Sequence, residues 1–143
     1  MKENNVFIKT SAVVAFQKNK VLLIKSSKNS GHLTGMYSLP AGRLENNETY
    51  VQAGVREFEE ESGLKTEEKY LVKLPTFYKA ELKRKSGSRK FCGWAFYCKK
   101  YWGELKASDE GEPQWIDVSK IKELKLQVNV EKMINEALNY HRV

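Results

Sequence analysis

The chain has few residues that could form thiol or imidazole sites. Among its 143 residues are two cysteines and two histidines. Cys92 and Cys98 are six positions apart in one apolar run, too distant along an extended strand to bridge each other, so we expect two reduced core residues. Neither forms a CxxC pair, and His32 and His141 are isolated. This pattern excludes a zinc site and Cys–His nucleophilic chemistry.

Long hydrophobic runs are also missing. The longest, Ala12 to Phe16 and Val21 to Ile24, are far shorter than a bilayer span or a signal-peptide core. We therefore expect a cytoplasmic protein with no membrane partner. The length and the absence of repeats or linkers predict a single domain over residues 1–143.

Positive charge is in excess. The chain has 25 Lys and Arg against 18 Asp and Glu, a net charge of +7, which favours polyanionic partners such as nucleotides or nucleic acid. Between Lys79 and Lys100, eight basic residues accompany one acidic residue, Glu81. This segment could hold a polyphosphate or RNA, or it could be a solvated hairpin whose lysines protect strand edges from aggregation.

The residue pattern predicts strands and two sizeable helices in irregular order. A first helix runs from about Asn47 to Ser62, with Val51, Val55, Phe58 and Ser62 on its apolar face and Gly63 at its end. An amphipathic helix follows near the C-terminus, with Val130, Met133, Ile134, Ala137 and Leu138 on one face. Ser119 is a candidate cap for a short helix between them. We expect a mixed sheet with helices on its faces.

Strands are predicted at 6–16, 21–26, 70–80, 90–99 and 114–118. The first two flank a hairpin turn at 17–20, and the next pair flank a turn at 86–88. A loop from Ser26 to Leu39 is long enough to line a site. Trp94 and Phe96 lie in the 90–99 run and are assigned to the core rather than to base stacking.

Acidic residues gather on the first helix. Residues 44–64 contain six Glu and one Arg. Glu57, Glu60 and Glu61 are spaced i, i+3 and i+4, so their carboxylates share a face, where like charges cost roughly 0.2–0.5 kcal/mol per pair. Clustered oxygen ligands without His or Cys suit Mg²⁺ or Mn²⁺. Taken alone, a run such as Glu59 to Glu61 could equally be a solvated acidic face.

The complete pattern is Gly42, five residues, Glu48, seven residues, Arg56-Glu57-Phe58, one residue, Glu60-Glu61, one residue and Gly63-Leu64. It resembles the Nudix box of the MutT/Nudix hydrolases without a gap. The resemblance implies an α/β fold, an α/β/α sandwich around a central mixed β-sheet. It also implies divalent-metal-dependent hydrolysis of a nucleoside diphosphate linked to another group.

By the same resemblance, Glu57, Glu60 and Glu61 would hold Mg²⁺ (or Mn²⁺) together with the Gly42 carbonyl. Arg56 and Glu48 would pair and orient these carboxylates. Glu57 is our first candidate for the general base and Glu61 the second. Glu110 and Glu112, in a later loop, are alternatives because family members differ on this point.

Loop aromatics are the candidates for a nucleobase or sugar pocket. Tyr37 and Tyr78 are the main ones, with Phe77 and His32 beside them, and Glu110 is a further substrate-binding candidate. Gly54 stands where the family commonly has alanine, which would allow a close approach of helix and sheet.

Several substrates remain open. Because the small chain resembles MutT-like members, nucleoside tri- or diphosphates come first, nucleotide sugars or ADP-ribose second, and RNA 5′ ends third. A nucleotide-sensing module without catalysis on the same fold is the alternative of another class. The sequence leaves the oligomeric state open, including a homodimer.

Overall fold

A computed structural model describes residues 6–27 and 34–141 of the chain. Two helices, ten strands and two short 3₁₀ helices lie in the described residues. In chain order they are β1 (Ile8–Val14), β2 (Phe16–Gln17), β3 (Lys20–Ser26), β4 (Tyr37–Ser38), β5 (Ala41–Arg43), α1 (Tyr50–Ser62), β6 (Leu64–Lys65), η2 (Glu68–Tyr70), β7 (Leu71–Arg84), β8 (Gly87–Cys98), β9 (Trp102–Gly103), β10 (Gly111–Asp117), η3 (Val118–Glu123) and α2 (Val130–Leu138).

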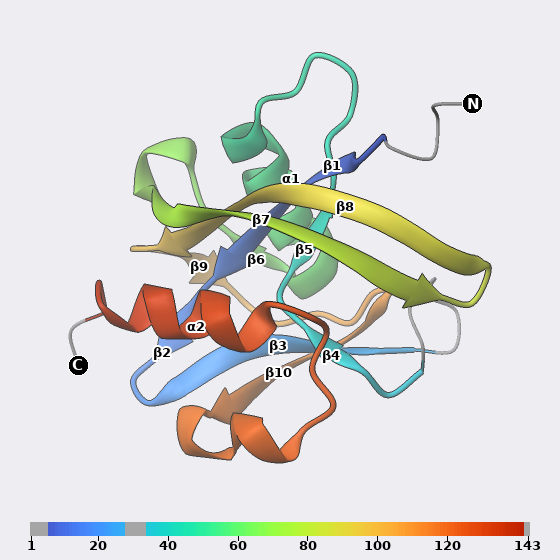
Figure 1. Cartoon of the computed structure of the whole chain (residues 1–143). Helices are drawn as coiled ribbons and strands as arrows, with labels where there is room; N and C mark the ends of the chain where they lie inside the picture. Colours follow the sequence, from blue (N-terminus) through green and yellow to red (C-terminus); the bar gives the residue numbers. More distant parts are fainter. Residues whose placement is uncertain (1–5, 28–33, 142–143) are drawn as a thin grey trace.

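The main sheet has the strand order β5-β1-β8-β7. Strands β1 and β8 pair in parallel, whereas β5 with β1 and β7 with β8 are antiparallel, so the sheet is mixed as predicted. A second sheet has the order β10-β3-β2, with β4 beside β3, and β6 pairs with β9. The mixed sheet carries the long β7–β8 hairpin at one edge (Figure 1).

The first predicted strand is divided between the two sheets. Residues 8–14 form β1 in the main sheet, while Phe16 and Gln17 form β2 and pair with β3. The predicted turn at 17–20 is present, with Lys18 at a positive φ of 55°. The continuous apolar run therefore links the two sheets, and this division decides which elements lie on each side of the core.

Successive residues of β1 point to opposite faces of the main sheet. Val13 and Ala15 pack in one core cluster with Phe58 of α1, whereas Ala12 and Val14 pack in the other with Ile134 of α2. Figure 1 shows the two helices on opposite sides of the strands. This arrangement confirms the expected α/β/α sandwich and places the acidic helix α1 on one face only.

Helix α1 begins later than predicted, at Tyr50. Thr49 caps it: its hydroxyl accepts from the Gln52 N–H, and the Gln52 side chain accepts from the Thr49 N–H. Gly63 ends the helix with φ 86°, as its position predicted. The fully buried residues of the helix are Ala53, Gly54, Phe58 and Ser62, while Val51 and Val55 are only half-buried. The predicted apolar face is thus confirmed for Phe58 and Ser62, while the two valines are only partly buried.

Gly54 brings the helix close to the sheet. A Cβ at this position would lie 3.1 Å from Ser11 Oγ and 3.4 Å from Val13 Cγ2. The Ser11 hydroxyl also donates to the Tyr50 carbonyl over 2.7 Å, which fixes the first turn of α1 on β1. The close approach expected from Gly54 is confirmed.

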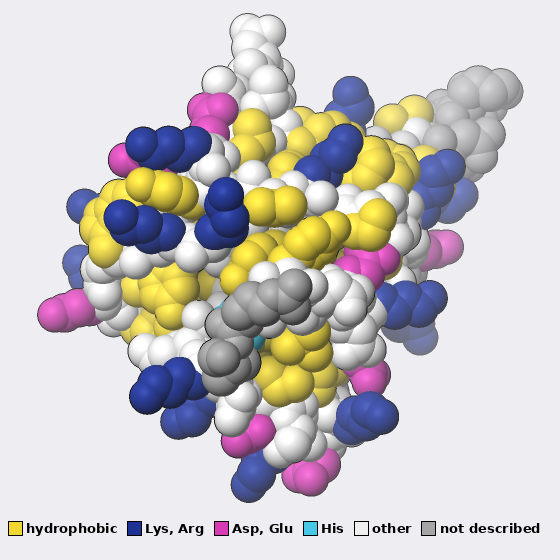
Figure 2. Space-filling model, turned by 90° about the vertical axis from the view of Figure 1, so that its left-hand side faces the viewer, with side chains coloured by type: hydrophobic (Ala, Val, Ile, Leu, Met, Phe, Trp, Pro, Cys, Tyr) yellow, Lys and Arg dark blue, Asp and Glu magenta, His cyan; other side chains and the backbone are white. Residues whose placement is uncertain are grey.

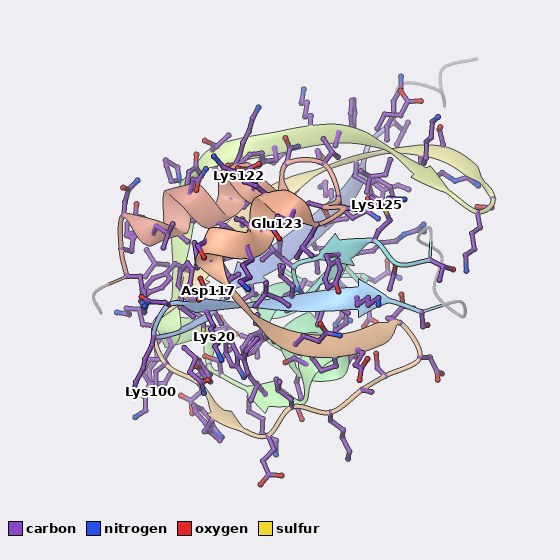
Figure 3. The ribbon with its side chains drawn as sticks, turned by 90° about the horizontal axis from the view of Figure 1, so that it is seen from below. Lys20, Lys100, Asp117, Lys122, Glu123 and Lys125 are labelled. Carbon is purple, nitrogen blue, oxygen red and sulfur yellow. The ribbon has the colours of Figure 1, made fainter. Side chains whose placement is uncertain are left out.

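The C-terminal elements largely follow the prediction. Helix α2 buries Val130, Ile134 and Ala137. The short helix η3 is capped by Asp117 and not by Ser119, because the Asp117 carboxylate accepts from the Ser119 N–H and hydroxyl. Asp117 also lies opposite Lys20 in the β10–β3 pairing, and the two appear side by side in Figure 3. Capping by Ser119 was therefore a wrong prediction, since the acidic residue two positions earlier does this.

Both cysteines are free, as predicted. Cys98 is buried, and burial raises the pKa of its thiol, whereas Cys92 is half-buried. In the described residues, no helix has the length and apolar character needed to cross a membrane.

Replacement of Phe58 by alanine tests the packing of α1. Phe58 is completely buried, so Phe58→Ala is expected to lower the free energy of unfolding by about 3–5 kcal/mol. Phe77→Ala is the matched control, because Phe77 is 39% exposed and its loss should cost less than about 1.5 kcal/mol. Urea unfolding measures both values. Equal losses in the two variants would contradict this account of the core.

Candidate active site

Arg56 of α1 lies among the carboxylates of the acidic segment. Its Nε and Nη2 donate to the two oxygens of Glu48 over 2.7 and 2.9 Å. Its Nη1 donates to Glu57 Oε2 over 2.9 Å and to Glu60 Oε1 over 3.2 Å. Nη2 also donates to the carbonyl of Arg43, at the end of β5, over 2.9 Å. One guanidinium therefore connects helix α1, the loop before it and strand β5.

This network is partly shielded from water. The side chains of Arg56, Glu48 and Glu57 are 21%, 14% and 13% exposed, whereas that of Glu60 is 57% exposed. The Arg56 hydrogen bonds hold the pKa of Glu48 below its ordinary value. Glu48 therefore stays ionised and fixes Arg56 through a bidentate pair, the strongest geometry for this ion pair.

Glu57 lies directly against the backbone of Gly42. A Cβ on Gly42 would stand 2.2 Å from the Glu57 carboxyl carbon, closer than any side chain allows. Burial raises the pKa of Glu57, and the nearby Glu60 and Glu110 add to the rise, while Arg56 opposes it. Glycine at position 42 is thus what lets a carboxylate approach strand β5.

Glu61 lies one turn further along α1 and points to the same strand. Its Oε1 accepts from the Ala41 N–H over 3.0 Å. Burial is the main cause that raises the pKa of this carboxyl well above its ordinary value, and Glu57 and Glu110 contribute to the rise. Glu57 and Glu61 are therefore two acids, both largely shielded from water, that lie next to each other, an arrangement common in active sites.

These groups line one acidic cleft of about 630 Å³. Strand β5 and the following loop form one side, and the acidic face of α1 forms another. Ser108, Asp109 and Glu110, in the loop before β10, complete the lining. Five glutamates line this space: Glu45, Glu57, Glu60, Glu61 and Glu110. Their negative charge would repel a phosphate chain unless cations were bound between them.

The donors in the cleft are oxygens, the ligand type that Mg²⁺ and Mn²⁺ prefer. Within residues 6–27 and 34–141, no three acidic, histidine or cysteine side chains already stand together as a metal cluster. Arg56 holds one oxygen each of Glu57 and Glu60 in the arrangement described. The residue types of the cleft fit a divalent cation, which the carboxylate oxygens of Glu57, Glu60 and Glu61 could hold.

A smaller, mainly apolar cavity of about 110 Å³ lies beside the cleft. Ala41 lines both spaces, so they adjoin at strand β5. Tyr78 of β7 and Asn129 at the start of α2 contribute polar groups to this cavity. The Asn129 side-chain amide donates to the Lys79 carbonyl over 3.3 Å, and its backbone has a positive φ of 71°.

Most of the predicted site residues come together in this arrangement. Gly42, Glu48, Arg56, Glu57, Glu60, Glu61 and Glu110 form or support the acidic cleft, and Tyr78 lines the apolar cavity. Tyr37, Phe77 and Glu112 line neither space. Tyr37 is half-buried and packs against the core cluster on the α2 side. His32 lies outside the described residues.

Sequence reasoning missed several contributors. The Ala41 N–H and the Arg43 carbonyl bind site side chains through their backbone, so no residue type indicated them. Asn129 lines the apolar cavity from the position before α2. Its signal was available, since asparagine tolerates a left-handed backbone at a helix boundary.

Comparisons with known proteins place this chain in one family. The family model described as NUDIX domain matches residues 7–137. The chain therefore belongs to the NUDIX domain family, which confirms the resemblance of the motif from Gly42 to Leu64. The solved structure of a MutT NUDIX hydrolase from Burkholderia pseudomallei has a TM-score of 0.77 and 19% identity, covering 92% of this chain and 98% of that one.

Two curated relatives share more sequence. A Caenorhabditis elegans protein with a nudix hydrolase name is 32% identical over 130 residues, which cover 85% of this chain. The ADP-ribose pyrophosphatase of Methanocaldococcus jannaschii is also 32% identical, over 85% of this chain and 68% of that protein. This chain spans about a third of the Caenorhabditis elegans relative, 32% of its length.

The raised pKa of Glu61 predicts an unusual pH dependence of stability. The pKa of Glu61 is higher in the folded than in the unfolded state. The contribution of this carboxyl to the free energy of unfolding is therefore complete at low pH, below the unfolded-state pKa. It is lost as the pH rises through the folded-state pKa, by about 1.4 kcal/mol for each pH unit between the two pKa values. Glu61→Gln should remove this loss and make the metal-free protein more stable than the wild type at pH 8.

Urea unfolding in EDTA at pH 5 and pH 8 measures the difference. Glu59→Gln is the matched control, because Glu59 is an exposed glutamate of the same helix. An unchanged pH dependence in Glu61→Gln would show that Glu61 does not titrate in this way.

Proposed function

We propose that this NUDIX domain is a divalent-metal-dependent pyrophosphohydrolase. It would cleave a phosphoric anhydride bond in a nucleoside diphosphate linked to another group. The observation that carries the proposal is the Glu57 carboxylate held by Arg56 against the backbone of Gly42, in a cleft that also contains Glu60, Glu61 and Glu110. A purely solvated acidic face would not require this fit between helix and strand.

We assign the metal ligands to Glu57, Glu60, Glu61 and the Gly42 carbonyl. Mg²⁺ or Mn²⁺ bound to them would offset phosphate charge and make a water molecule easier to deprotonate, together worth several kcal/mol of the barrier. Arg56 and Glu48 act as positioning residues, because their bidentate pair fixes the guanidinium that orients Glu57 and Glu60.

Glu57 is the first candidate for the general base. Its raised pKa makes its carboxylate a better proton acceptor than an exposed glutamate, and Arg56 holds the group in one orientation. Glu61, whose pKa is raised further, is the second candidate, and Glu110 faces both from the opposite loop. Glu112 is a weaker alternative because it is exposed on β10 and does not line the cleft.

The two adjoining spaces divide the substrate in two. The phosphates would lie in the acidic cleft, and the nucleoside would enter the apolar cavity beside Tyr78 and Asn129. Nucleoside tri- or diphosphates are the first substrate class. ADP-ribose is the second, supported by the name of the Methanocaldococcus jannaschii relative.

The decisive experiment is product analysis with Mg²⁺ over a panel of nucleoside tri- and diphosphates, nucleotide sugars, ADP-ribose and triphosphorylated RNA. Release of a nucleoside monophosphate, or its RNA equivalent, would support the enzyme and identify the leaving group. Tight nucleotide binding with no turnover of any panel member would contradict it and favour a nucleotide-sensing module.

Carboxylate-to-amide variants test the assignment residue by residue. We expect Glu57→Gln, Glu60→Gln and Glu61→Gln each to lower kcat at least ~100-fold, because each would weaken the metal charge stabilisation. Glu59→Gln should keep near wild-type turnover, since Glu59 is exposed and does not line the cleft. Steady-state kinetics on the best substrate compare the four variants. Near-normal turnover in all three site variants would remove the metal assignment.

Gly42→Ala tests the close approach of Glu57 to the backbone. The added methyl group would occupy the position of the carboxylate, so we expect kcat to fall at least ~10-fold while the fold is retained. Turnover and circular dichroism of the same preparation separate the two effects. Wild-type turnover in a folded Gly42→Ala protein would show that catalysis does not depend on the Glu57 carboxylate lying against Gly42.

A further inference from the structure

Part of the main sheet is not covered by α1. The helix packs mainly on β1 and β5. The ring of its first residue, Tyr50, meets the ring of Phe77 on β7 edge-on, with ring centroids 6.5 Å apart. Beyond that contact, the same face of β7 and β8 continues toward the turn of their hairpin. In Figure 1 this turn projects past both helices.

Aromatic rings and lysines lie close together on this uncovered face, which also carries Glu81, opposite Lys90. Phe77 and Trp94 lie opposite each other in the β7–β8 pairing, with ring centroids 5.1 Å apart. Lys73 Nζ lies 4.1 Å from the centroid of Trp94. Lys79 and Lys90 lie 5.3 and 6.0 Å from the ring of Phe7, just before β1. We call this set the aromatic–lysine surface: Phe7, Lys73, Phe77, Lys79, Lys90 and Trp94.

The exposed ring of Phe77 is the feature of this surface that protection of an edge strand does not explain. Phe77 is 39% exposed although it contacts two other aromatic rings, and Phe7 and Trp94 are half-buried. Lysines alone would be explained by β7, an edge strand that charge protects against pairing with other chains. That explanation does not account for the exposed ring of Phe77, which would itself favour association.

The charge of the hairpin indicates the sign of the partner. Residues 79–90 contain six basic residues and one acidic residue, Glu81. The acidic cleft lies over β5, at the other edge of the sheet, so the two surfaces have opposite charge. The positive hairpin therefore attracts a polyanion directly. At the acidic cleft, by contrast, bound cations would be needed to offset the repulsion between the polyanion and the carboxylates.

We propose that the aromatic–lysine surface binds single-stranded nucleic acid. Bases would stack on Phe77 and the neighbouring rings, and the lysines would contact the phosphates, the combination by which sequence-tolerant single-strand binding arises. The proposal concerns binding and goes beyond the proposed hydrolysis of nucleotides. Its outcome therefore does not depend on whether the cleft is catalytic.

Fluorescence anisotropy tests the proposal with a labelled single-stranded RNA of about 12 nucleotides and the matching DNA. Both carry a 5′-hydroxyl, so they have no anhydride bond to hydrolyse and Mg²⁺ can be present. We expect affinity that falls steeply with salt. Equal affinity for RNA and DNA would support base stacking, because the bases of both can stack. A higher affinity for RNA would support stacking together with additional contacts to the 2′-hydroxyl groups.

Phe77→Ala should weaken binding roughly 5- to 100-fold, as expected for the loss of one stacking ring. The pair Lys73→Gln and Lys90→Gln should lower the slope of log K against log salt by about 0.7 for each phosphate that a lysine no longer neutralises. Phe77→Ala should still hydrolyse a small nucleotide substrate at the wild-type rate, because Phe77 lines neither site cavity. Urea unfolding confirms that this variant is folded.

Trp102→Ala is the matched control. Trp102 is 41% exposed and contacts Tyr70 at 6.4 Å, and Tyr70 has Lys69 and Lys100 near its ring. Its strand β9 lies at the opposite end of the molecule from the hairpin turn (Figure 1). Figure 2 looks at that opposite end and shows hydrophobic side chains next to Lys and Arg there too. The control variant therefore also removes an exposed aromatic ring near lysines, but at the end of the molecule opposite the hairpin turn.

Three results would overturn the proposal. The first is unchanged affinity in folded Phe77→Ala, and the second is an equal or greater loss of affinity in Trp102→Ala. The third is equally tight binding of polyglutamate, which would show that charge without stacking explains the surface.

Discussion

The ion-pair network of Arg56 holds the acidic part of this molecule together. Glutamates at i, i+3 and i+4 repel one another, and burying Glu57 and Glu61 adds a desolvation cost. A single guanidinium offsets part of this cost by bonding to Glu48, Glu57 and Glu60. Because it also bonds to the Arg43 carbonyl, the same group fixes strand β5 relative to the helix. The geometry of the cleft follows from that one connection.

The two faces of β1 separate two kinds of chemistry. On one face Val13 packs with Phe58, and α1 brings its carboxylates to β5; on the other, Ala12 packs under α2 and lines the apolar cavity. Ala41 of β5 lies at the junction, lining both spaces. An acidic cleft and an apolar cavity therefore adjoin without mixing, an arrangement suited to a ligand with a charged and an apolar part.

Predictability differed between elements for physical reasons. Helix α1, its end at Gly63 and helix α2 follow from local periodicity and capping, which depend on nearby residues. The division of the first strand between two sheets does not, because pairing of Ile8 with Phe91 is a contact between distant residues. Tyr37 was a reasonable ligand candidate as a loop aromatic, yet its packing in the core keeps it out of both cavities.

The sequence by itself determined the acidic helix face, the glycine at position 42 and the family motif that joins them. These are properties of residue type and spacing, and they are readable along one segment. Only the tertiary structure decided that Glu57 lies against Gly42, that Glu61 accepts from the Ala41 N–H, and that Glu110 faces both. It also decided that Phe77 stays exposed beside Trp94. Burial, pKa shifts and exposed surfaces come from residues far apart in the chain, and a local pattern does not specify them.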